Sequence, residues 1–278
     1  MNLSIAHTKM LLEESGIRRE VVEARGYRTA YKKADLKRLG FSENQCNVPG
    51  LLMPVHGPNR EIVTYQYRPD EPRIRGGKPV KYEIPSGSRM VLDLHPLARE
   101  KLGDPSTPLF LTEGVKKGDA LASRGRLCAL TLLGVWNWRG ANGKDGKVAL
   151  PEWEVVALND RRVYIVFDSD VMLKKEVHAA LARLKLFLES RGADVAVIYL
   201  PSGESGTKQG VDDYLVAGHS VDDLLGLATT TLREPPEGAE AAEEPDTQAA
   251  ELVRYADDAH LFHTPDGESY AAFPLEDR

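Results

Sequence analysis

Three carboxylates stand directly after two short apolar runs of the chain. Glu113 follows residues 109–112 in LFLTEGVKKGDAL, and Asp168 and Asp170 follow residues 163–167 in VYIVFDSD. Because one residue separates the two aspartates, both side chains leave the same side of an extended strand end. Carboxylate oxygens without His or Cys suit a hard cation, so the pattern predicts catalytic carboxylates that hold Mg2+ or Mn2+.

Convergence of these acids has an energetic cost. Two unit charges about 4 Å apart repel by roughly 4 kcal/mol at an effective dielectric of 20. If Glu113 lies on a strand next to that of Asp168, a cation must offset this repulsion, and Asp168→Asn is expected to leave the metal-free protein equally or more stable. The alternative is that Asp168 and Asp170 cap the following helix, since acids at a helix N-terminus do this well.

A Gly- and Ser-rich loop carries a second group of charges. The segment SGESGTKQGVDDYL, residues 202–215, follows an apolar run and contains Lys208, Asp212 and Asp213. Lys208 is predicted to reach a phosphate, and the two aspartates to hold a second metal. The alternative is that Asp212 caps the helix that begins there.

Two short motifs each have two interpretations. Lys116 and Lys117 follow Gly114, where a helix N-terminus favours phosphate, or they are solvated surface lysines. In GVWNWRG, Trp136 and Trp138 stack a base or close the core. At least one of the two tryptophans is expected in the core, because burial is the commoner use of this side chain.

A basic stretch with interleaved tyrosines lies nearer the N-terminus. The tyrosines are Tyr65, Tyr67 and Tyr82, and the candidate contact residues are Arg68, Arg73, Arg75, Lys78 and Lys81. Cations bind phosphates and exposed aromatic rings stack bases, so the stretch predicts a surface for single-stranded DNA or RNA. The alternative is that the alternating tyrosines only pack within a strand.

The elements that must position these residues follow an α/β pattern. Strand-like runs are found at residues 108–112, 127–134, 163–167 and 193–201, and helical patterns between them end at Gly125 and Gly192. This alternation predicts an α/β fold with a mostly parallel sheet flanked by helices. Ligands of such sheets bind beyond the carboxyl ends of the strands, where Glu113, Asp168 and Asp170 stand.

A smaller α+β N-terminal subdomain is predicted before this sheet. Helical patterns cover residues 3–14, 17–27 and 33–41, with stops at Gly26 and Gly40, and strand patterns cover residues 50–57, 61–70 and 80–85. The helices are expected to pack on the next layer. A helix-turn-helix nucleic-acid reader is the alternative.

Composition divides the chain further. With 278 residues, 42% hydrophobic and 28% charged, it is typical of a globular protein of one or two domains, and Cys46 and Cys128 show no disulfide or zinc spacing. No membrane-length apolar run or signal peptide is seen, which predicts a cytoplasmic protein without a membrane partner. The expected divisions are 1–95 for the N-terminal subdomain, 96–232 for the α/β domain, 233–250 for a disordered acidic linker and 251–278 for the start of an incomplete C-terminal module.

The motifs FLTEG, GDAL and VYIVFDSD resemble the Toprim domain of bacterial primases, topoisomerases and several nucleases, whose signature is a Glu after the first strand and Asp-x-Asp after the third. The phrases SGIRREVVEARGY, YRPDEPR, KPVKYEIP, TEGVKKGDAL, GVWNW and KQGVDDYL are more closely similar to the Toprim-like domain of plasmid or phage primase-helicase-type replication proteins. The resemblance covers about residues 9 to 225. It implies that Glu113 is a general acid/base or metal-positioning group and that Asp168 and Asp170 bind the divalent ion.

Two departures from the bacterial primases bear on primer synthesis. Lys117 stands where those primases have an Asp four residues after the motif Glu, and Asp119 comes two residues later; no zinc-binding segment precedes the domain. The cofactor-binding set is therefore expected to be Lys116, Lys117, Asp119 and Lys208.

The resemblance implies a Mg-dependent enzyme of primase-like nucleotidyl transfer in plasmid or phage DNA replication. Its expected partners are single-stranded DNA or RNA, nucleotides and a helicase or ATPase module in the longer chain. Two alternatives share the same residues: a Toprim nuclease, and a non-catalytic nucleic-acid-binding module that serves the attached helicase.

Overall fold

The structure is a computed structural model that describes residues 2–59, 61–125, 127–141, 146–235, 260–263 and 269–272. The chain forms two compact units, Met1–Ala239 and Glu240–Arg278. In the second unit, β14 (His260–His263) and β15 (Ser269–Ala272) pair antiparallel, as the sequence predicts. The turn between them and most of the predicted acidic linker, from residue 236 onward, lie outside the described residues.

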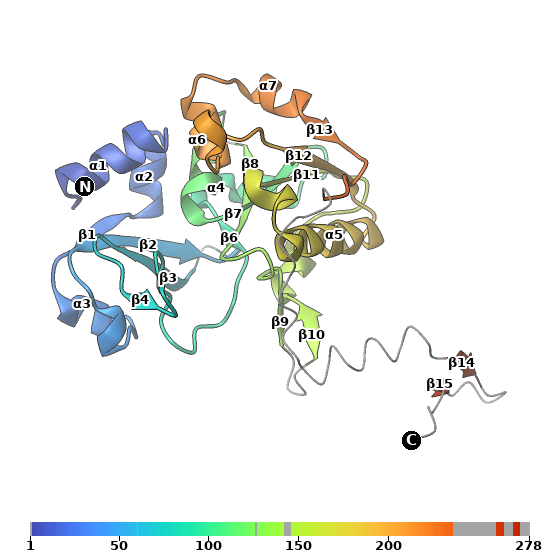
Figure 1. Ribbon diagram of the computed structural model, residues 1–278, viewed down its shortest axis with the longest axis horizontal. Helices are drawn as coiled ribbons and strands as arrows, with labels where there is room; N and C mark the ends of the chain where they lie inside the picture. Colours follow the sequence, from blue (N-terminus) through green and yellow to red (C-terminus); the bar gives the residue numbers. More distant parts are fainter. Residues whose placement is uncertain are drawn as a thin grey trace. The chain divides into compact units, whose positions relative to one another are not determined.

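A six-stranded sheet forms the centre of the first unit (Figure 1), with the order β13-β12-β11-β7-β8-β6. Its parallel strands are β7 (Leu109–Glu113), β8 (Cys128–Leu132), β11 (Arg162–Phe167) and β12 (Asp194–Tyr199). The predicted mostly parallel sheet is thus confirmed. Two short antiparallel strands that the sequence did not predict, β6 (Asp93–Leu94) and β13 (Ala228–Thr229), form its edges.

Helices cover both faces of this sheet, because its strands are apolar on both sides. On one face Leu109 and Leu111 of β7 pack in a core cluster with Leu184 of α5 (Lys175–Ser190). On the other face Phe110 packs in a second cluster with α4 (Val115–Ala122) and α6 (Val211–Val216). The alternation of Leu109, Phe110 and Leu111 follows the two-residue period of a strand. The chain then continues into α7 (Val221–Gly226).

Helix α4 lies unusually close to β8. A Cβ atom on Gly118 would stand 2.1 Å from Oγ1 of Thr131, so only glycine permits this approach. Because α4 begins directly after Glu113, this close packing holds the first turn of α4 against the sheet edge at which Glu113 lies.

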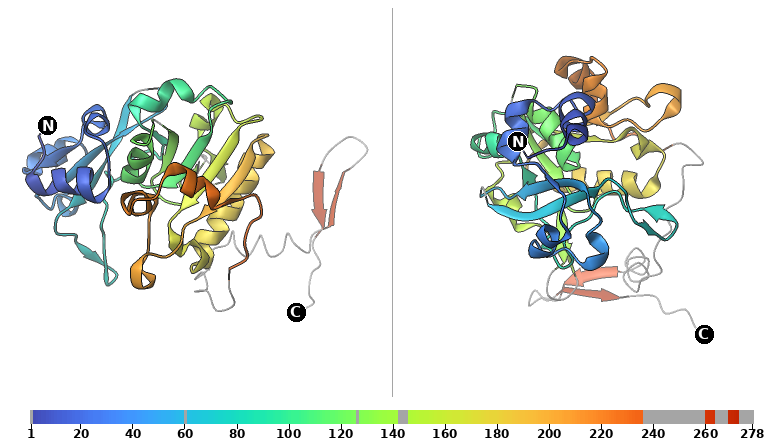
Figure 2. Two further views of the ribbon diagram at one scale, coloured as in Figure 1. Left: turned by 90° about the horizontal axis from the view of Figure 1, so that it is seen from above. Right: turned by 90° about the vertical axis from the view of Figure 1, so that its left-hand side faces the viewer.

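The N-terminal elements lie beside the central sheet, coloured blue to cyan in Figures 1 and 2. They comprise α1 (Ile5–Lys9), a π-helical turn (Met10–Glu14), α2 (Arg19–Arg25), α3 (Lys33–Arg38) and an antiparallel sheet of β1 (Arg28–Ala30), β2 (Gly50–His56) and β3 (Ile62–Pro69). Gly26 ends α2 with a left-handed φ of 84°, as predicted. Strand β1 separates α2 from α3, so these two helices do not form the helix-turn-helix unit of the alternative interpretation.

One predicted strand is wrong. Residues 80–85 form no strand; their contact with β3 is a single bridge between Tyr67 and Glu83. The preceding residues instead form a two-stranded hairpin, β4 (Ile74–Arg75) and β5 (Lys78–Pro79). Two backbone hydrogen bonds of 2.8 Å between Tyr67 and Glu83 and the buried side chain of Glu83 hold the chain at this point.

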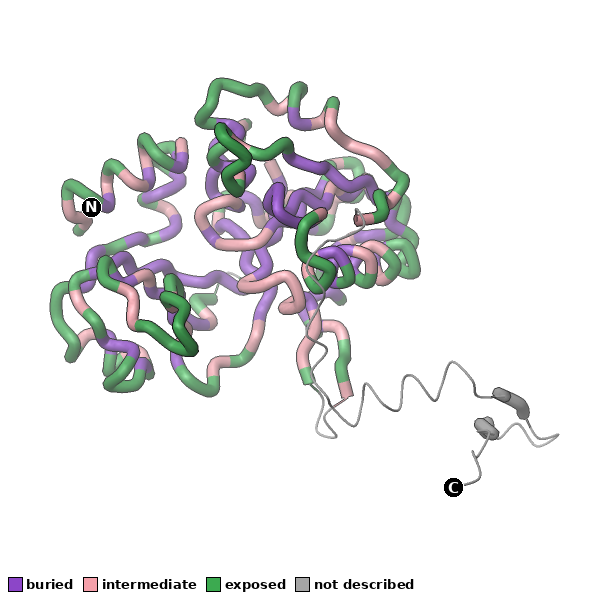
Figure 3. The backbone as a smooth tube through the Cα atoms, viewed as in Figure 1, coloured by how far each residue is buried: buried purple, intermediate pink, exposed green. Residues whose placement is uncertain are grey.

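The remaining elements are short. β9 (Arg139–Ala141) and β10 (Lys147–Ala149) form a hairpin. The 3-10 helices are Glu43–Gln45, Pro96–Lys101, Pro151–Val155, Ser169–Met172 and Glu204–Gly206. Figure 3 shows that buried residues concentrate along the strands. No helix in the described part of the chain is long and apolar enough to cross a membrane.

Candidate functional site

The carboxyl ends of β7 and β11 bring the predicted acids together. The two strands pair in parallel, with Thr112 opposite Val166. Glu113 is the last residue of β7, and Asp168 directly follows the last residue of β11. The expectation that Glu113 lies on a strand next to that of Asp168 is therefore confirmed. The physical reason is that parallel strands run in the same direction, so their carboxyl ends lie at the same edge of the sheet.

Lysines surround the two aspartates of the Asp-x-Asp motif. The side chain of Asp168 is 4% exposed; its Oδ1 lies 2.5 Å from Lys117 Nζ and its Oδ2 lies 2.7 Å from Lys208 Nζ. Asp170 Oδ2 lies 2.8 Å from Lys174 Nζ and 3.2 Å from Lys208 Nζ. The cations that offset the acidic charge in this structure are lysine ammonium groups, whereas the sequence predicted Mg2+ or Mn2+ in that role.

The capping alternative fails for Asp168. This residue precedes the 3-10 helix Ser169–Met172, but its side chain accepts no capping hydrogen bond from that helix. The N-cap of α5 is Lys174, which also makes no side-chain capping bond. Asp168 Oδ1 has the contact with Lys117 but no hydrogen bond of good geometry. Since a buried carboxylate needs partners, the side chain is positioned for charge rather than for a helix end.

Burial and charge shift the pKa values of the acids in opposite directions. Burial raises the pKa of Glu113; Lys117 opposes this shift and the Asp168 charge adds to it. For Asp170, burial acts upward, but the bonds from Lys174 and Lys208 prevail and lower its pKa. Two neighbouring carboxylates with opposite shifts are the arrangement in which one group holds a proton and another stays ionised.

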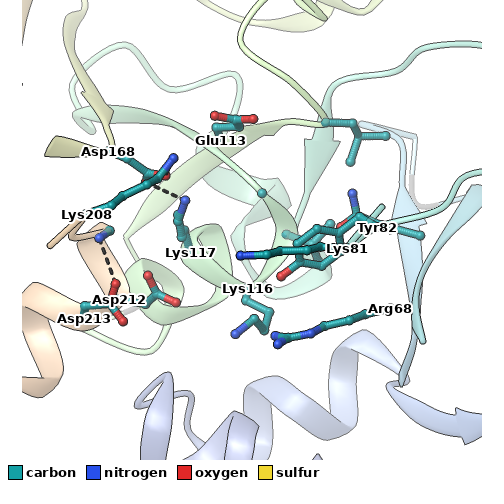
Figure 4. Close-up of a pocket in the computed structure, with 15 residues that line it drawn as sticks. Arg68, Lys81, Tyr82, Glu113, Lys116, Lys117, Asp168, Lys208, Asp212 and Asp213 are labelled. Atoms are coloured by element: carbon teal, nitrogen blue, oxygen red, sulfur yellow. Dashed lines mark hydrogen bonds and ion pairs between the residues drawn. The ribbon is translucent and has the colours of Figure 1, made fainter. Parts of the chain in front are cut away.

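A cavity of about 690 Å3 opens at this edge of the sheet (Figure 4). In that view Glu113, Asp168 and Asp212 lie toward one side, and Arg68, Lys81 and Tyr82 toward the other. Lys116 and Lys117 lie between the two groups. The full lining is Gln66, Arg68, Lys81, Tyr82, Glu113, Gly114, Val115, Lys116, Lys117, Leu133, Asp168, Lys208, Gly210, Asp212 and Asp213.

The two aspartates of the Gly- and Ser-rich loop have different positions. Asp213 Oδ2 accepts a hydrogen bond of 2.8 Å from the Gly210 backbone N–H, so Asp213 rather than Asp212 caps α6. Asp212 is 6% exposed, and its Oδ1 has no hydrogen-bond partner. Burial raises the pKa of Asp212, and Lys116 opposes that shift. A buried acceptor without a partner on a cavity wall is suited to a donor or cation that arrives with a ligand.

The second wall comes from the N-terminal elements. Arg68 of β3 lies with its guanidinium 5.8 Å from the ring centroid of Tyr82, and Lys81 stands beside them on the cavity wall. Lys116 donates to Ser15 Oγ over 2.9 Å, and burial lowers its pKa. The sequence singled out the cations and the base-stacking candidate Tyr82, but it missed Gln66 and Lys174. Lys174 stands four residues after Asp170, a helical ion-pair spacing that could have identified it.

Asp119 does not belong to this site, contrary to the predicted cofactor-binding set. It is fully buried behind α4, where Arg25 Nε donates to its Oδ2 over 3.0 Å and Tyr27 donates to the same oxygen over 2.7 Å. Arg25 Nη1 also lies 2.5 Å from Asp93 Oδ1. The reason is helical geometry: two residues beyond Lys117, the side chain points to the opposite side of α4. This buried cluster joins α2, β6 and α4.

The predicted nucleic-acid contacts are also divided. Arg68 and Lys81 line the cavity. Arg73 is instead engaged by Glu83, with Nε–Oε1 and Nη2–Oε2 distances of 2.5 and 3.0 Å. Arg75 and Lys78 are exposed on the β4–β5 hairpin and are not part of the cavity lining. Two of the five residues thus lie at the cavity, one is paired internally and two lie on a separate surface.

The side-chain oxygens at this site are of the kind that binds a divalent metal ion, but the described residues are not arranged as a metal site. Glu113, Asp168, Asp170 and Asp212 offer oxygen atoms, which Mg2+ prefers, and Asp212 Oδ1 is free. Within the described residues, however, no group of three or more His, Cys, Asp or Glu side chains is arranged to hold a metal ion. Lysines occupy the positions next to the Asp168 and Asp170 oxygens.

The fold is that of primase catalytic cores. The chain is similar to the Aquifex aeolicus primase zinc-binding and RNA polymerase domains, at 16% identity, 81% coverage of this chain, 55% of that chain and a TM-score of 0.54. It is also similar to a DNA primase domain from Pseudomonas aeruginosa, at 18% identity, 80% and 72% coverage and a TM-score of 0.53. A DnaG primase catalytic domain bound to single-stranded DNA is also similar, at 17% identity, 80% coverage of this chain, 71% coverage of that chain and a TM-score of 0.52.

Sequence comparisons give a more limited result. Residues 101–221 match a domain of unknown function, DUF3854. An uncharacterized protein of Picosynechococcus sp. (strain ATCC 27264 / PCC 7002 / PR-6) is 34% identical over 124 residues, which are 41% of this chain. The match spans 12% of the length of that relative. The matched domain contains Glu113, Asp168, Asp170 and the lysines that contact the two aspartates.

Proposed function

We propose that the protein is a Mg-dependent nucleic-acid enzyme of the Toprim type that carries out primase-like nucleotidyl transfer in plasmid or phage DNA replication. The observation that carries the proposal is the cavity in which Glu113, Asp168 and Asp212 face Arg68, Lys81, Lys116, Lys117 and Lys208. A nucleoside triphosphate and a strand end need cations for their phosphates and carboxylates for a metal and a proton. Similarity to primase catalytic cores supports this assignment at the level of fold.

The acids would hold the metal. Glu113, Asp168 and Asp170 are the residues proposed to bind Mg2+ or Mn2+, with Asp212 and Asp213 available to a second ion. A bound divalent ion would supply charge neutralisation at phosphate oxygens and lower the pKa of an attacking hydroxyl. Lys117 and Lys208, which contact Asp168 here, would then be released toward the phosphates of a nucleotide.

Glu113 is proposed as the proton-handling group. Its raised pKa, caused first by burial, makes it a better base toward a hydroxyl than a solvated glutamate would be. The Asp168 carboxylate contacts the ammonium groups of Lys117 and Lys208, so its proposed role is electrostatic. A nuclease would use the same groups to activate water, and a turnover assay separates the two reactions.

A non-catalytic role is favoured by one specific observation. The lysines already neutralise Asp168 and Asp170, so the cavity is compatible with a strand or nucleotide held by cations without a metal. In that case the protein would hold a template for an attached helicase or ATPase module. This second candidate function predicts binding that EDTA does not weaken.

The deciding experiment is a product-length assay. The protein is incubated with labelled single-stranded DNA, nucleotides and Mg2+ or Mn2+, and the products are resolved by length. Longer products support nucleotidyl transfer, shorter ones a nuclease, and unchanged strands a binding role. Glu113→Gln and Asp168→Asn should abolish turnover. Asp222→Asn removes an exposed carboxylate of α7 and should have no effect.

A further inference from the structure

A cluster of cations and tryptophans lies outside the cavity, after β8. Trp136, partly exposed, has the guanidinium carbon of Arg139 4.3 Å from its ring centroid and that of Arg183 5.8 Å from it. Arg139 also lies 5.6 Å from the centroid of Trp138. Two arginines that share one indole ring are thus held close together, although their like charges repel.

The two arginines of the cluster have no acidic partner among the described residues. No carboxylate of the described residues forms an ion pair with Arg139 or Arg183. The indole Nε1 of Trp138, a residue that is 7% exposed, is buried without a hydrogen-bond partner. Burial lowers the pKa of Arg139, and the nearby Arg183 lowers it further. Two neighbouring guanidinium groups without a carboxylate partner among the described residues suit an anionic ligand.

The tryptophans explain why this arrangement is rigid. Trp138 stacks on Phe187 of α5 at a centroid distance of 4.9 Å, and Trp153 donates to the Trp138 backbone oxygen over 2.9 Å. Trp138 is therefore a core residue, which confirms the expectation that at least one of the two tryptophans is buried. Trp136 remains partly exposed beside it, and two guanidinium groups lie over its ring.

The cluster is connected to the cavity by a short segment. Leu133 lines the cavity, and Trp136 follows three residues later. Since an extended chain spans at most about 3.6 Å per residue, the Cα atoms of the two residues are no more than about 11 Å apart. A strand that ends in the cavity and continues past this segment carries a phosphate on every nucleotide, so one phosphate lies within reach of the arginines.

We propose that Trp136, Arg139 and Arg183 form a clamp for a backbone phosphate of single-stranded nucleic acid. Arginine suits this role because its planar fork donates two parallel hydrogen bonds to phosphate while its face stacks on an aromatic ring. The identity of the anion as a nucleic-acid strand rests on the proposed function. The clamp adds to that function a second contact, outside the cavity, which fixes the path of the strand.

The test measures strand binding without turnover. Anisotropy of a labelled single-stranded oligonucleotide is titrated in EDTA, without nucleotides, at several salt concentrations. Arg183 is exposed, so Arg183→Gln is expected to fold normally; Arg139→Gln is the second variant. Each should bind about tenfold more weakly at low salt. Each should also reduce the slope of log K against log salt by about 0.7, the value for one phosphate contact on a single strand.

Arg191→Gln is the matched control. Arg191 follows α5, lies over an aromatic ring as Arg183 does, but already has a carboxylate partner, Glu154, at 3.0 Å. It should bind with the affinity and slope of the parent. Parental affinity and slope in both clamp variants would overturn the proposal. So would an equal loss in the binding of a mononucleotide, since the anion would then be a free phosphate compound.

These outcomes are separable from failure of the proposed function. If the clamp variants bind as the parent does but the parent forms longer products, the clamp is wrong and nucleotidyl transfer stands. If the clamp variants lose strand binding but the parent forms no product, the clamp stands with the binding role.

Discussion

Lys208 Nζ lies 2.7 Å from Asp168 Oδ2, and these residues come from loops that follow two different strands of the sheet. The same ammonium group lies 3.2 Å from Asp170 Oδ2. One lysine therefore bridges both aspartates of the Asp-x-Asp motif. A divalent ion at these oxygens would have to displace this lysine, so the proposed function implies that metal binding and phosphate binding are coupled at the cavity.

The first prediction concerns Asp168→Asn. Because the structure pairs Asp168 with Lys117 and Lys208, the substitution should lower the stability of the metal-free protein by on the order of 1 kcal/mol, the opposite of the sign expected from three unrelieved acids. Millimolar Mg2+ should raise the melting temperature of the parent by mass action, and the variant should lose most of that rise. Thermal melts of both proteins with EDTA and with Mg2+ check this. A parent indifferent to Mg2+ and Mn2+ would contradict the metal site.

The second prediction concerns the pH dependence of Glu113. Burial raises its pKa above the ordinary value of 4.5, so the folded state binds this proton more tightly than the unfolded state does. Its effect on stability is therefore unfavourable at pH values above the folded-state pKa and disappears as the pH falls below the ordinary value. Glu113→Gln should be more stable than the parent at neutral pH, and the difference should vanish on acidification.

Urea denaturation of both proteins across a pH series measures this effect. Glu176→Gln, a substitution at an exposed position in the first turn of α5, is the control and should show no such pH-dependent gain. If Glu113→Gln is equally or less stable than the parent at neutral pH, burial of the ionised Glu113 carboxylate does not destabilise the folded state.

The third prediction concerns the buried cluster of Arg25, Asp93 and Asp119. The side chains of all three residues are 0% exposed, and Asp119→Asn would leave the Arg25 charge with only one acid. The expected loss is about 3–5 kcal/mol, the range measured when one partner of a buried ion pair is removed. Asp35→Asn, which removes a half-exposed acid 3.5 Å from Arg38, should cost less than about 1 kcal/mol. Equal urea midpoints for the two variants would contradict the structural role of the cluster.

The fourth prediction separates the basic residues of the N-terminal elements. Arg68→Gln and Lys81→Gln should each weaken single-strand binding and lower the salt slope by about 0.7, because both residues line the cavity. Arg73→Gln should leave the slope unchanged, since Glu83 already engages Arg73. Anisotropy titrations at several salt concentrations measure all three. A slope that falls for Arg73→Gln as much as for Arg68→Gln would place the strand on the hairpin side instead.

Local sequence patterns determined the four parallel strands of the sheet and two of its catalytic candidates. Apolar runs with a two-residue period defined β7 and β11, and the parallel arrangement then placed Glu113 and Asp168 at one edge. The sequence also predicted the helix ends at Gly26 and Gly192. In the structure both glycines have the left-handed φ that is common where a helix ends. These features depend on residues close together in the chain, which is why a single sequence contains them.

Tertiary structure decided how the remaining charges are paired. Lys117 and Lys208 approach the aspartates from segments remote from them in the chain, and Asp119 turns away from the cavity to meet Arg25, which is 94 residues earlier. Nothing in the local pattern distinguishes Arg73, engaged by Glu83, from Arg68, which faces the cavity. Charge pairing depends on distances between distant segments and on burial, and a long flexible side chain can serve any acid within its reach. The sequence therefore specified which residues could do chemistry, and packing specified which of them face one another.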